Sequence, residues 1–334
     1  MKKTFKIIAL VLSFVMMIAA MTACSDSKTD SSDSNNGKSL KIGIIQYMSH
    51  PSLDNCYQGI KEALDASGLN FEIDYQTGSS ASADSDCASF AKNMVSNNVD
   101  MIFAIATPAA KAAYSATDDT DIPVIFCAVS DPVVAKLVES EEKPGDKCTG
   151  TSDVLDLEAQ VNMITAMQPN VKKIGILYTS SEDNSIANLA RFKEVCDNKG
   201  IEVIASAVQN ASDIPSAAEE LASKVDCINN FTDNNVVNNL SVVLSAADKY
   251  NIPVYGSEEE QVKNGCLASV SIDYVALGKV TGQMGIDVLG GSDITKMPVK
   301  TITDATPVIN SDVLEVLGMT LPADYTNAQT VKSN

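Results

Sequence analysis

The chain has 334 residues, with 43 Asp and Glu against 24 Lys and Arg, which gives a formal net charge of −19 and a pI near 4.3. Such an acidic balance opposes binding to nucleic acid phosphates, so we expect no nucleic acid partner. The sequence holds a single histidine and lacks HExxH, GxSxG and GxGxxG motifs. These absences argue against an enzyme, and we expect no cofactor and no metal site.

The first residues resemble an export signal. Lysines at the start are followed by an almost wholly apolar stretch, 7–20, and by the small residues before Cys24. This arrangement is similar to a bacterial lipoprotein signal, so we predict a signal peptide over 1–23 and a lipid on Cys24. The polar residues that follow predict a lipidated tether over 24–39, because they cannot bury a core. The alternative is a short transmembrane anchor.

Phrases of the first half return in the second half at nearly one offset. Lys41-Ile-Gly-Ile44 returns 132 positions later as Lys173-Ile-Gly-Ile176, and Ile122-Pro-Val124 returns after 130 positions as Ile252-Pro-Val254. Matches in the same order across a whole module indicate a duplicated lobe rather than a short tandem repeat. We therefore expect two similar lobes with a cleft between them.

Within each lobe, short apolar runs alternate with helical patterns, which is typical of βαβ units and parallel sheets. In the first lobe we predict strands near 40–46, 71–75, 100–105 and 123–128, and helices near 52–67, 83–97 and 107–117. In the second we predict strands near 173–178, 201–207, 225–229 and 253–256, and helices near 184–198, 212–222 and 235–248. The fold class is therefore α/β, with two Rossmann-like lobes joined by a hinge.

Ligands of parallel sheets bind outside the carboxyl ends of the strands, so the loops after strands supply the candidate site. The candidate ligand-binding residues in these loops are Gln46, His50, Thr107, Pro108, Ser130, Asp131, Ser180, Ser181, Asn184, Phe231, Thr232, Asp233, Asn234, Glu258 and Asp273. Thr107-Pro108 and Asp131-Pro132 are typical of helix starts whose amides can face an anion. The alternative for each such residue is helix capping alone.

From Lys41 to about Leu317 the chain resembles the substrate-binding lipoproteins of ABC transporters that have the type I periplasmic-binding fold. The motifs that carry the resemblance are Lys41-Ile-Gly-Ile-Ile-Gln46, His50-Pro-Ser-Leu-Asp54, Ala106-Thr-Pro-Ala-Ala110, Ser130-Asp-Pro132, Gly150-Thr-Ser-Asp153, Thr232-Asp-Asn234, Glu258-Glu259, Lys263-Asn-Gly265 and Asp273-Tyr274. The resemblance is to the group that includes binders of tryptophan and other aromatic amino acids.

This resemblance implies lobe 1 over 40–152 plus 274–300, lobe 2 over 153–273 plus 301–334, and closure of the hinge on a ligand. It also implies an ABC permease as partner, membrane contact through the lipid, an extracytoplasmic location and a monomer. The expected ligand is an aromatic or other apolar amino acid. A sugar or nucleoside binder, or a sensory receptor that reports to a kinase, stays open as an alternative.

Each part of an amino acid needs its own partner in the cleft. We expect the ammonium at Asp131, Asp233, Glu258 or Asp273, because charge-assisted hydrogen bonds are the strong ones. For the carboxylate we expect amides and hydroxyls around Thr107, Ser180 and Ser181. The candidates to pack on an apolar side chain are Tyr47, Tyr57, Phe231 and Tyr274, although a core or surface role is favoured for the helical residues Tyr57 and Tyr274. His50 is expected to form a hydrogen bond rather than to act as a pH switch.

Seven cysteines besides Cys24 are scattered without a CxxC motif. We expect buried free thiols, with one disulfide as the alternative.

Overall fold

The computed structural model describes residues 39–302 and 304–334. The predicted signal peptide, the predicted lipid on Cys24 and all of the predicted tether except Ser39 lie outside these residues. Within the described ranges, every helix is too short or too polar to span a bilayer. All seven described cysteines are buried free thiols, as expected.

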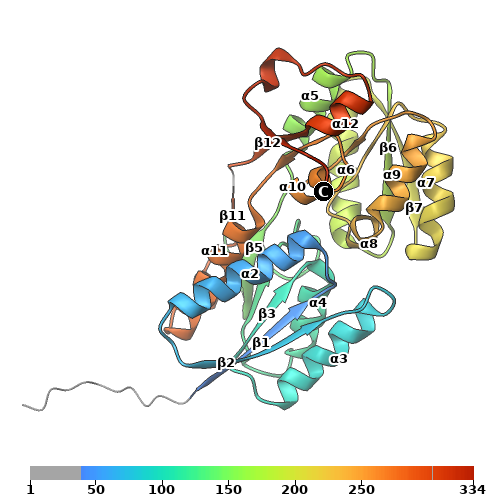
Figure 1. Cartoon of the computed structure of the whole chain (residues 1–334). Helices are drawn as coiled ribbons and strands as arrows, with labels where there is room; N and C mark the ends of the chain where they lie inside the picture. Colours follow the sequence, from blue (N-terminus) through green and yellow to red (C-terminus); the bar gives the residue numbers. More distant parts are fainter. Residues whose placement is uncertain (1–38, 303) are drawn as a thin grey trace, which may run out of the picture. The chain divides into compact units, whose positions relative to one another are not determined.

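The first sheet is parallel and has the strand order β11-β5-β4-β3-β1-β2 (Figure 1). Its strands are β1 (Leu40–Gln46), β2 (Phe71–Thr77), β3 (Met101–Ile105), β4 (Val124–Cys127), β5 (Cys148–Ser152) and β11 (Lys300–Thr301). The helices α2 (Pro51–Ala66), α3 (Ala83–Ser96), α4 (Thr107–Ala116) and α11 (Tyr274–Leu289) pack on it. The central strand β3 is buried along its whole length, which is why it reads as a continuous apolar run. We call this unit lobe 1.

The second parallel sheet has the order β7-β6-β8-β9. Its strands are β6 (Lys173–Thr179), β7 (Glu202–Val208), β8 (Cys227–Asn229) and β9 (Val254–Tyr255). The helices around it are α5 (Leu157–Met167), α6 (Asp183–Asn198), α7 (Ile214–Ala222), α8 (Asn234–Asn238), α9 (Leu240–Asp248) and α10 (Glu259–Lys263), with a 3₁₀ turn η1 (Ala211–Asp213) before α7.

A small third sheet adjoins the second one. It contains β10 (Ala268–Ser271), β12 (Thr306–Asn310) and β13 (Gln329–Val331). The backbone amide of Leu267, directly before β10, donates to Val254 O in β9 at 2.7 Å and so links the two sheets. The remaining elements are η2 (Ile294–Lys296), α12 (Ser311–Val316) and η3 (Ala323–Tyr325). The second and third sheets with α5 to α10 and α12 form lobe 2.

Helix α11 comes late in the chain but packs against α2 of lobe 1 (Figure 1). Glycines make this close approach possible, because a Cβ on Gly278 would lie 2.2 Å from Cys56 O and one on Gly59 would lie 2.1 Å from Val275 O. The chain thus crosses from one lobe to the other three times. The crossings follow β5, β10 and β11.

The prediction of two α/β lobes with parallel sheets is confirmed. In each lobe the second strand lies outside the first and the next two follow on the other side, so the two sheets repeat one order, as the repeated phrases indicated. One predicted helix, 235–248, is divided into α8 and α9 at Asn239. Strands β5, β10, β12 and β13 and helix α5 were not among the predicted elements.

Candidate ligand-binding site

A cavity with about 320 Å³ of space between its atoms lies where both lobes present the ends of their strands. Its lining residues follow β1, β3, β4 and β5 in lobe 1 and β6, β8 and β9 in lobe 2, with one residue from the start of α11. They are His50, Ser52, Leu53, Ala106, Thr107, Ala128, Ser130, Asp153, Asn184, Thr232, Asn234, Val237, Glu258 and Tyr274. Only a small part of this space is wide enough for a water molecule, so the cavity is narrow in this conformation.

Polar contacts join the two lobes around this cavity. His50 Nε2 lies 3.3 Å from Asn234 Oδ1, and Ser130 Oγ lies 3.5 Å from Thr232 Oγ1. At the edge, Lys111 forms an ion pair with Asp183. The lobes are therefore in contact around the cavity in this conformation.

The lobe 1 wall offers hydroxyl groups and helix starts. Ser52 Oγ and Thr107 Oγ1 are buried and have no hydrogen-bond partner in the described part of the chain. They lie in the first turns of α2 and α4, where proline occupies one of the first two positions and no side chain caps the free amides. Such amides and hydroxyls suit an anionic group, because the positive end of each helix dipole faces it.

Two residues of this wall hold a backbone conformation that side chains rarely adopt. Ala106 has φ +80° and Ala128 has φ +56°, and both line the cavity. Positive φ at non-glycine residues is strained and clusters at ligand sites, where the surrounding structure enforces it.

The lobe 2 wall offers acceptors. Asn184 Oδ1 and Glu258 Oε2 are buried and have no partner among the described residues. Burial raises the pKa of Glu258 to about 8, and the charges of Glu260 and Asp153 add to this shift. A buried carboxylate without a cation is costly, so this group favours a cationic ligand.

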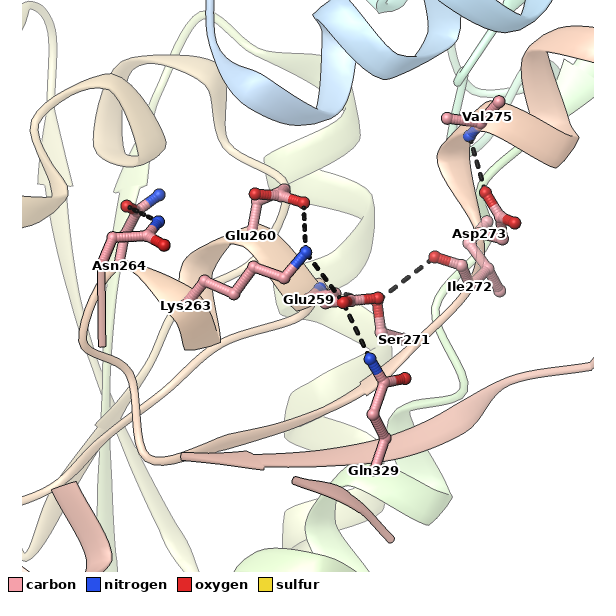
Figure 2. A network of polar contacts seen from close by, with 10 residues as sticks. Glu259, Glu260, Lys263, Asn264, Ser271, Ile272, Asp273, Val275 and Gln329 are labelled. Atoms are coloured by element: carbon pink, nitrogen blue, oxygen red, sulfur yellow. Dashed lines mark hydrogen bonds and ion pairs between the residues drawn. The ribbon is translucent and has the colours of Figure 1, made fainter. Parts of the chain in front are cut away.

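The position of Glu258 depends on contacts around α10 (Figure 2). The backbone amide of Glu259, the next residue, donates to Ser271 Oγ at 2.7 Å, which ties α10 to the segment before α11. On the other side, Glu259 Oε1 accepts from Gln329 Nε2 at 2.8 Å and pairs with Lys263 Nζ at 2.9 Å. These contacts fix the start of α10, which directly follows Glu258.

A second carboxylate, Asp153, lies at the end of β5. Its Oδ1 accepts from Ser130 Oγ at 2.9 Å and its Oδ2 accepts from Tyr274 OH at 3.1 Å. Burial raises the pKa of Asp153, while the two hydroxyl donors act against the shift. Burial also lowers the pKa of His50 to about 4, so this imidazole is neutral at pH 7. No Lys or Arg is among the residues that line the cavity.

Seven of the fifteen candidate residues predicted from sequence line this cavity. They are His50, Thr107, Ser130, Asn184, Thr232, Asn234 and Glu258.

Three predicted ammonium partners do not line it, because their carboxylates accept from nearby backbone amides. Asp233 and Asp273 cap helices, whereas the predicted helix start at Asp131-Pro132 is wrong, since 132–136 form a turn. Asp273 accepts from the amides of Val275 and Ala276 and is exposed, and Asp131 accepts from the amide of Val134. Asp233 is fully buried, and its oxygens accept from the amide of Val236 and from Thr179 and Ser185 in lobe 2.

The other five predicted residues also lie outside the cavity lining. The side-chain amide of Gln46 already forms hydrogen bonds with Met48 O, Asp54 and Tyr75. Pro108 takes a position in the first turn of α4 without lining the cavity. Ser180 and Ser181 are exposed, and Phe231 packs in the lobe 2 core against Phe192, with ring centroids 5.4 Å apart.

The lining residues absent from the prediction are Ser52, Leu53, Ala106, Ala128, Asp153, Val237 and Tyr274. Five of them stand inside motifs that carried the resemblance, so the motifs held a usable signal: Ser52, Leu53, Ala106, Asp153 and Tyr274. Tyr274 lies in a helix, where an aromatic residue is more often part of the core.

The described residues contain no group of three or more His, Cys, Asp or Glu side chains that could hold a metal ion.

Comparison with known proteins shows close similarity over the whole body. Residues 41–331 match the family of ABC transporter substrate binding proteins. A tyrosine-binding protein of Clostridioides difficile (strain R20291) is 36% identical over 344 residues, which cover 100% of this chain and 98% of that protein. The ABC domain in complex with L-Trp from Streptococcus pneumonia is 38% identical with a TM-score of 0.84, and the match covers 88% of this chain and 100% of that one.

A third similar structure is the ligand-free, open form of a substrate binding protein with adhesive properties from Clostridium difficile. It is 36% identical and has the same coverage, 88% of this chain and 100% of that one, but its TM-score is 0.67. The chain thus matches the L-Trp complex better than the open form at nearly the same identity, which agrees with the contacts between its lobes. This chain belongs to the ABC transporter substrate-binding proteins, extracytoplasmic receptors that bind small molecules for a transporter.

Proposed function

We propose that the cavity binds an aromatic amino acid as a zwitterion. One observation carries this proposal: the buried polar atoms without partners differ between the two walls. Lobe 1 contributes the hydroxyls of Ser52 and Thr107 together with Nδ1 of His50, and lobe 2 contributes only acceptors, Asn184 Oδ1 and Glu258 Oε2. A ligand with a carboxylate at one end of its polar group and an ammonium at the other satisfies both walls.

The charge of the cavity supports an ammonium group. Asp153 and Glu258 both line the cavity, and no cationic side chain accompanies them there. An ammonium supplies the missing positive charge through charge-assisted hydrogen bonds, each worth about 1.5 to 3 kcal/mol. A sugar or nucleoside, the alternative ligand, carries no such charge and leaves the carboxylates unpaired.

The apolar part of the wall supports an apolar side chain on the ligand. Leu53, Val237 and Tyr274 line the cavity together with Ala106 and Ala128. Aromatic ligands gain both area and ring contacts in such surroundings. The similar proteins point the same way, since one is named a tyrosine-binding protein and another was solved with L-Trp.

The receptor cycle follows from the two lobes. We propose that the lobes, with the boundaries 40–152 plus 274–300 and 153–273 plus 301–334, close on the ligand and that the closed monomer docks on an ABC permease. We further propose that a lipid on Cys24 holds the protein at the membrane surface. A Cys24→Ser variant is then expected to leave the detergent phase in a partitioning assay, and unchanged partitioning would remove the anchor from the proposal.

Calorimetry on the full chain in mild detergent tests the ligand. L-tyrosine, L-tryptophan and L-phenylalanine are compared with their deaminated and decarboxylated analogues, with sugars and with nucleosides. The proposal expects at least one intact aromatic amino acid to bind more tightly than both of its truncated analogues. Binding of sugars or nucleosides alone would overturn the ligand while leaving the receptor class in place. Uptake measured with and without the permease separates transport from signalling to a kinase.

A further inference from the structure

Glu182 lies directly before α6, outside the cavity lining, and its side chain accepts four N–H donors. Its Oε2 accepts from the Asn234 amide nitrogen at 3.1 Å, from Asn234 Nδ2 at 2.7 Å and from Asn184 Nδ2 at 3.2 Å. Its Oε1 accepts from the backbone amide of Asn235 at 3.3 Å. The residue is 2% exposed, so these donors replace water. Burial raises the pKa of Glu182 to about 8 and the charge of Asp233 adds to this shift, whereas the N–H donors act against it. The ionised carboxylate only accepts, and a backbone amide donates to each of its two oxygens, so the side chains of Asn184 and Asn234 meet it with their NH₂ groups.

Glu182 thereby decides which end of two side-chain amides faces the cavity. An asparagine side chain has one donor end and one acceptor end. Because the NH₂ groups of Asn184 and Asn234 point to Glu182, their Oδ1 atoms point away from it. Asn184 Nδ2 also donates to Thr232 O at 3.1 Å, which supports the same orientation. Asn184 Oδ1 is left buried without a partner in the described chain, and Asn234 Oδ1 lies 3.3 Å from His50 Nε2.

The orientation of Asn234 also determines the tautomer of His50 in the opposite lobe. Asn234 Oδ1 only accepts, so the hydrogen of the neutral imidazole must be on Nε2 of His50. Nδ1 is then an unprotonated acceptor, and it is buried without a partner among the described residues. Glu182, which lies outside the cavity lining, thus determines the orientation of three acceptor atoms beside the cavity. They are Asn184 Oδ1, Asn234 Oδ1 and His50 Nδ1.

We propose that Glu182 is a positioning residue for the amino end of the ligand. By holding the two NH₂ groups, it presents acceptor atoms to the cavity, and these recognise a hydrogen-bond donor such as an ammonium. The inference rests on the proposed function for the identity of the ligand, but the orientation of the two amides belongs to lobe 2 alone. Asp233, the neighbouring buried carboxylate, bonds Thr179 and Ser185 and does not hold either amide.

The orientation is tested first without ligand. In the full chain, NMR of the side-chain NH₂ groups of Asn184 and Asn234 should show slow exchange with water. Glu182→Gln keeps the size of the side chain but offers one acceptor and one donor end, so at least one of these groups should lose its protection. Asp226→Asn is the matched control, because Asp226 accepts from the amides of Lys172 and Lys173 in the same lobe but not at the cavity. Rapid exchange of both groups in the unaltered protein would overturn the inference.

The functional part is tested with L-tyrosine and its deaminated analogue, 3-(4-hydroxyphenyl)propionate. Glu182→Gln should weaken L-tyrosine binding by about tenfold or more, as expected for the loss of one bond to a charged group. Binding of the analogue, which has no ammonium, should change far less. A purely structural role would weaken both compounds equally, and that outcome would count against positioning. Asp226→Asn should leave both affinities unchanged.

The single histidine gives a third readout that needs no variant. With ¹⁵N-labelled histidine and bound L-tyrosine, the one imidazole signal should report hydrogen on Nε2, and a Nδ1–H tautomer would contradict the inference. Failure of the proposed function has a different signature. In that case no aromatic amino acid binds to the unaltered protein, while the NH₂ groups of Asn184 and Asn234 still exchange slowly and respond to Glu182→Gln.

Discussion

Replacing Glu258 by glutamine should raise the stability of the ligand-free protein and lower its affinity for the ligand. The Glu258 side chain is buried, and burial raises its pKa from 4.5 to about 8. At about 1.36 kcal/mol per pH unit, this difference corresponds to a cost of at most about 5 kcal/mol for the ionised form in the folded protein. Of this, no more than about 3 kcal/mol is expressed at pH 7. Glutamine removes that cost because it does not ionise.

The pH dependence has a definite sign. Since the pKa of Glu258 is higher in the folded protein, the folded state holds the proton more tightly than the unfolded state does. The stability from this group is complete below about 4.5 and is lost as the pH rises to about 8. A bound ammonium favours the ionised carboxylate, so ligand affinity should rise over the same window with release of a proton. His50 titrates lower, near 4, because burial lowers its pKa.

The Glu258→Gln variant should lose one charge-assisted hydrogen bond to the ligand ammonium. Such a bond is worth about 1.5 to 3 kcal/mol, which corresponds to about 10- to 150-fold in affinity. The affinity of the variant should also depend less on pH. Burial also raises the pKa of Asp153, so part of the pH dependence of the affinity should remain in the variant. Calorimetry in buffers of different ionisation enthalpy measures both the affinity and the protons released. Thermal unfolding without ligand measures the stability.

The matched control is Glu220→Gln, which removes a carboxylate of lobe 2 that pairs with Lys224 outside the cavity lining. It should leave affinity and proton release unchanged, because an exposed ion pair contributes little. If Glu258→Gln bound the ligand as tightly as the unaltered protein and released as many protons, Glu258 would not face the ammonium.

Further variants test the rest of the site and its scaffold. Asp233→Ala should lower the stability of lobe 2 by about 3 kcal/mol or more in urea unfolding, because buried donors lose their acceptor; unchanged stability would contradict its capping role. Gly278→Ala should destabilise lobe 1 by about 3 kcal/mol, since the new methyl would lie 2.2 Å from Cys56 O; a stable variant would mean that α2 and α11 can separate. Ser130→Ala should raise the pKa of Asp153 and weaken ligand binding more at acidic than at alkaline pH, as calorimetry across a pH series would show.

Much of the fold could be predicted because its main elements have local signals. The central strands are buried apolar runs, and each is followed by an amphipathic helix within a βαβ unit. Strand β5 (Cys-Thr-Gly-Thr-Ser) has no such signal, because it is polar yet fully buried. Strands β12 and β13 owe their structure to pairing with distant segments, which no local pattern reveals.

The site was only partly predictable for a related reason. The rule that ligands meet the carboxyl ends of strands located the correct loops, but within a loop it did not say which side chain turns inward. Asp131, Asp233 and Asp273 were predicted to meet an ammonium, whereas neighbouring backbone amides of a turn or a helix start compete for the same carboxylates and hold them. Asp153 escaped prediction because it follows β5, the strand whose sequence gives no strand pattern.

The buried carboxylates also explain how ligand binding and lobe closure become linked. In the closed conformation Asp153 and Glu258 face the same narrow cavity, and the lining includes no cation to compensate them. Closing the lobes without a ligand therefore carries the cost of burying these charges or of protonating them. A ligand ammonium removes that cost only in the closed form, where both lobes surround it. Because a ligand shifts an equilibrium by its difference in affinity for the two states, the unpaired carboxylates make closure depend on the ligand.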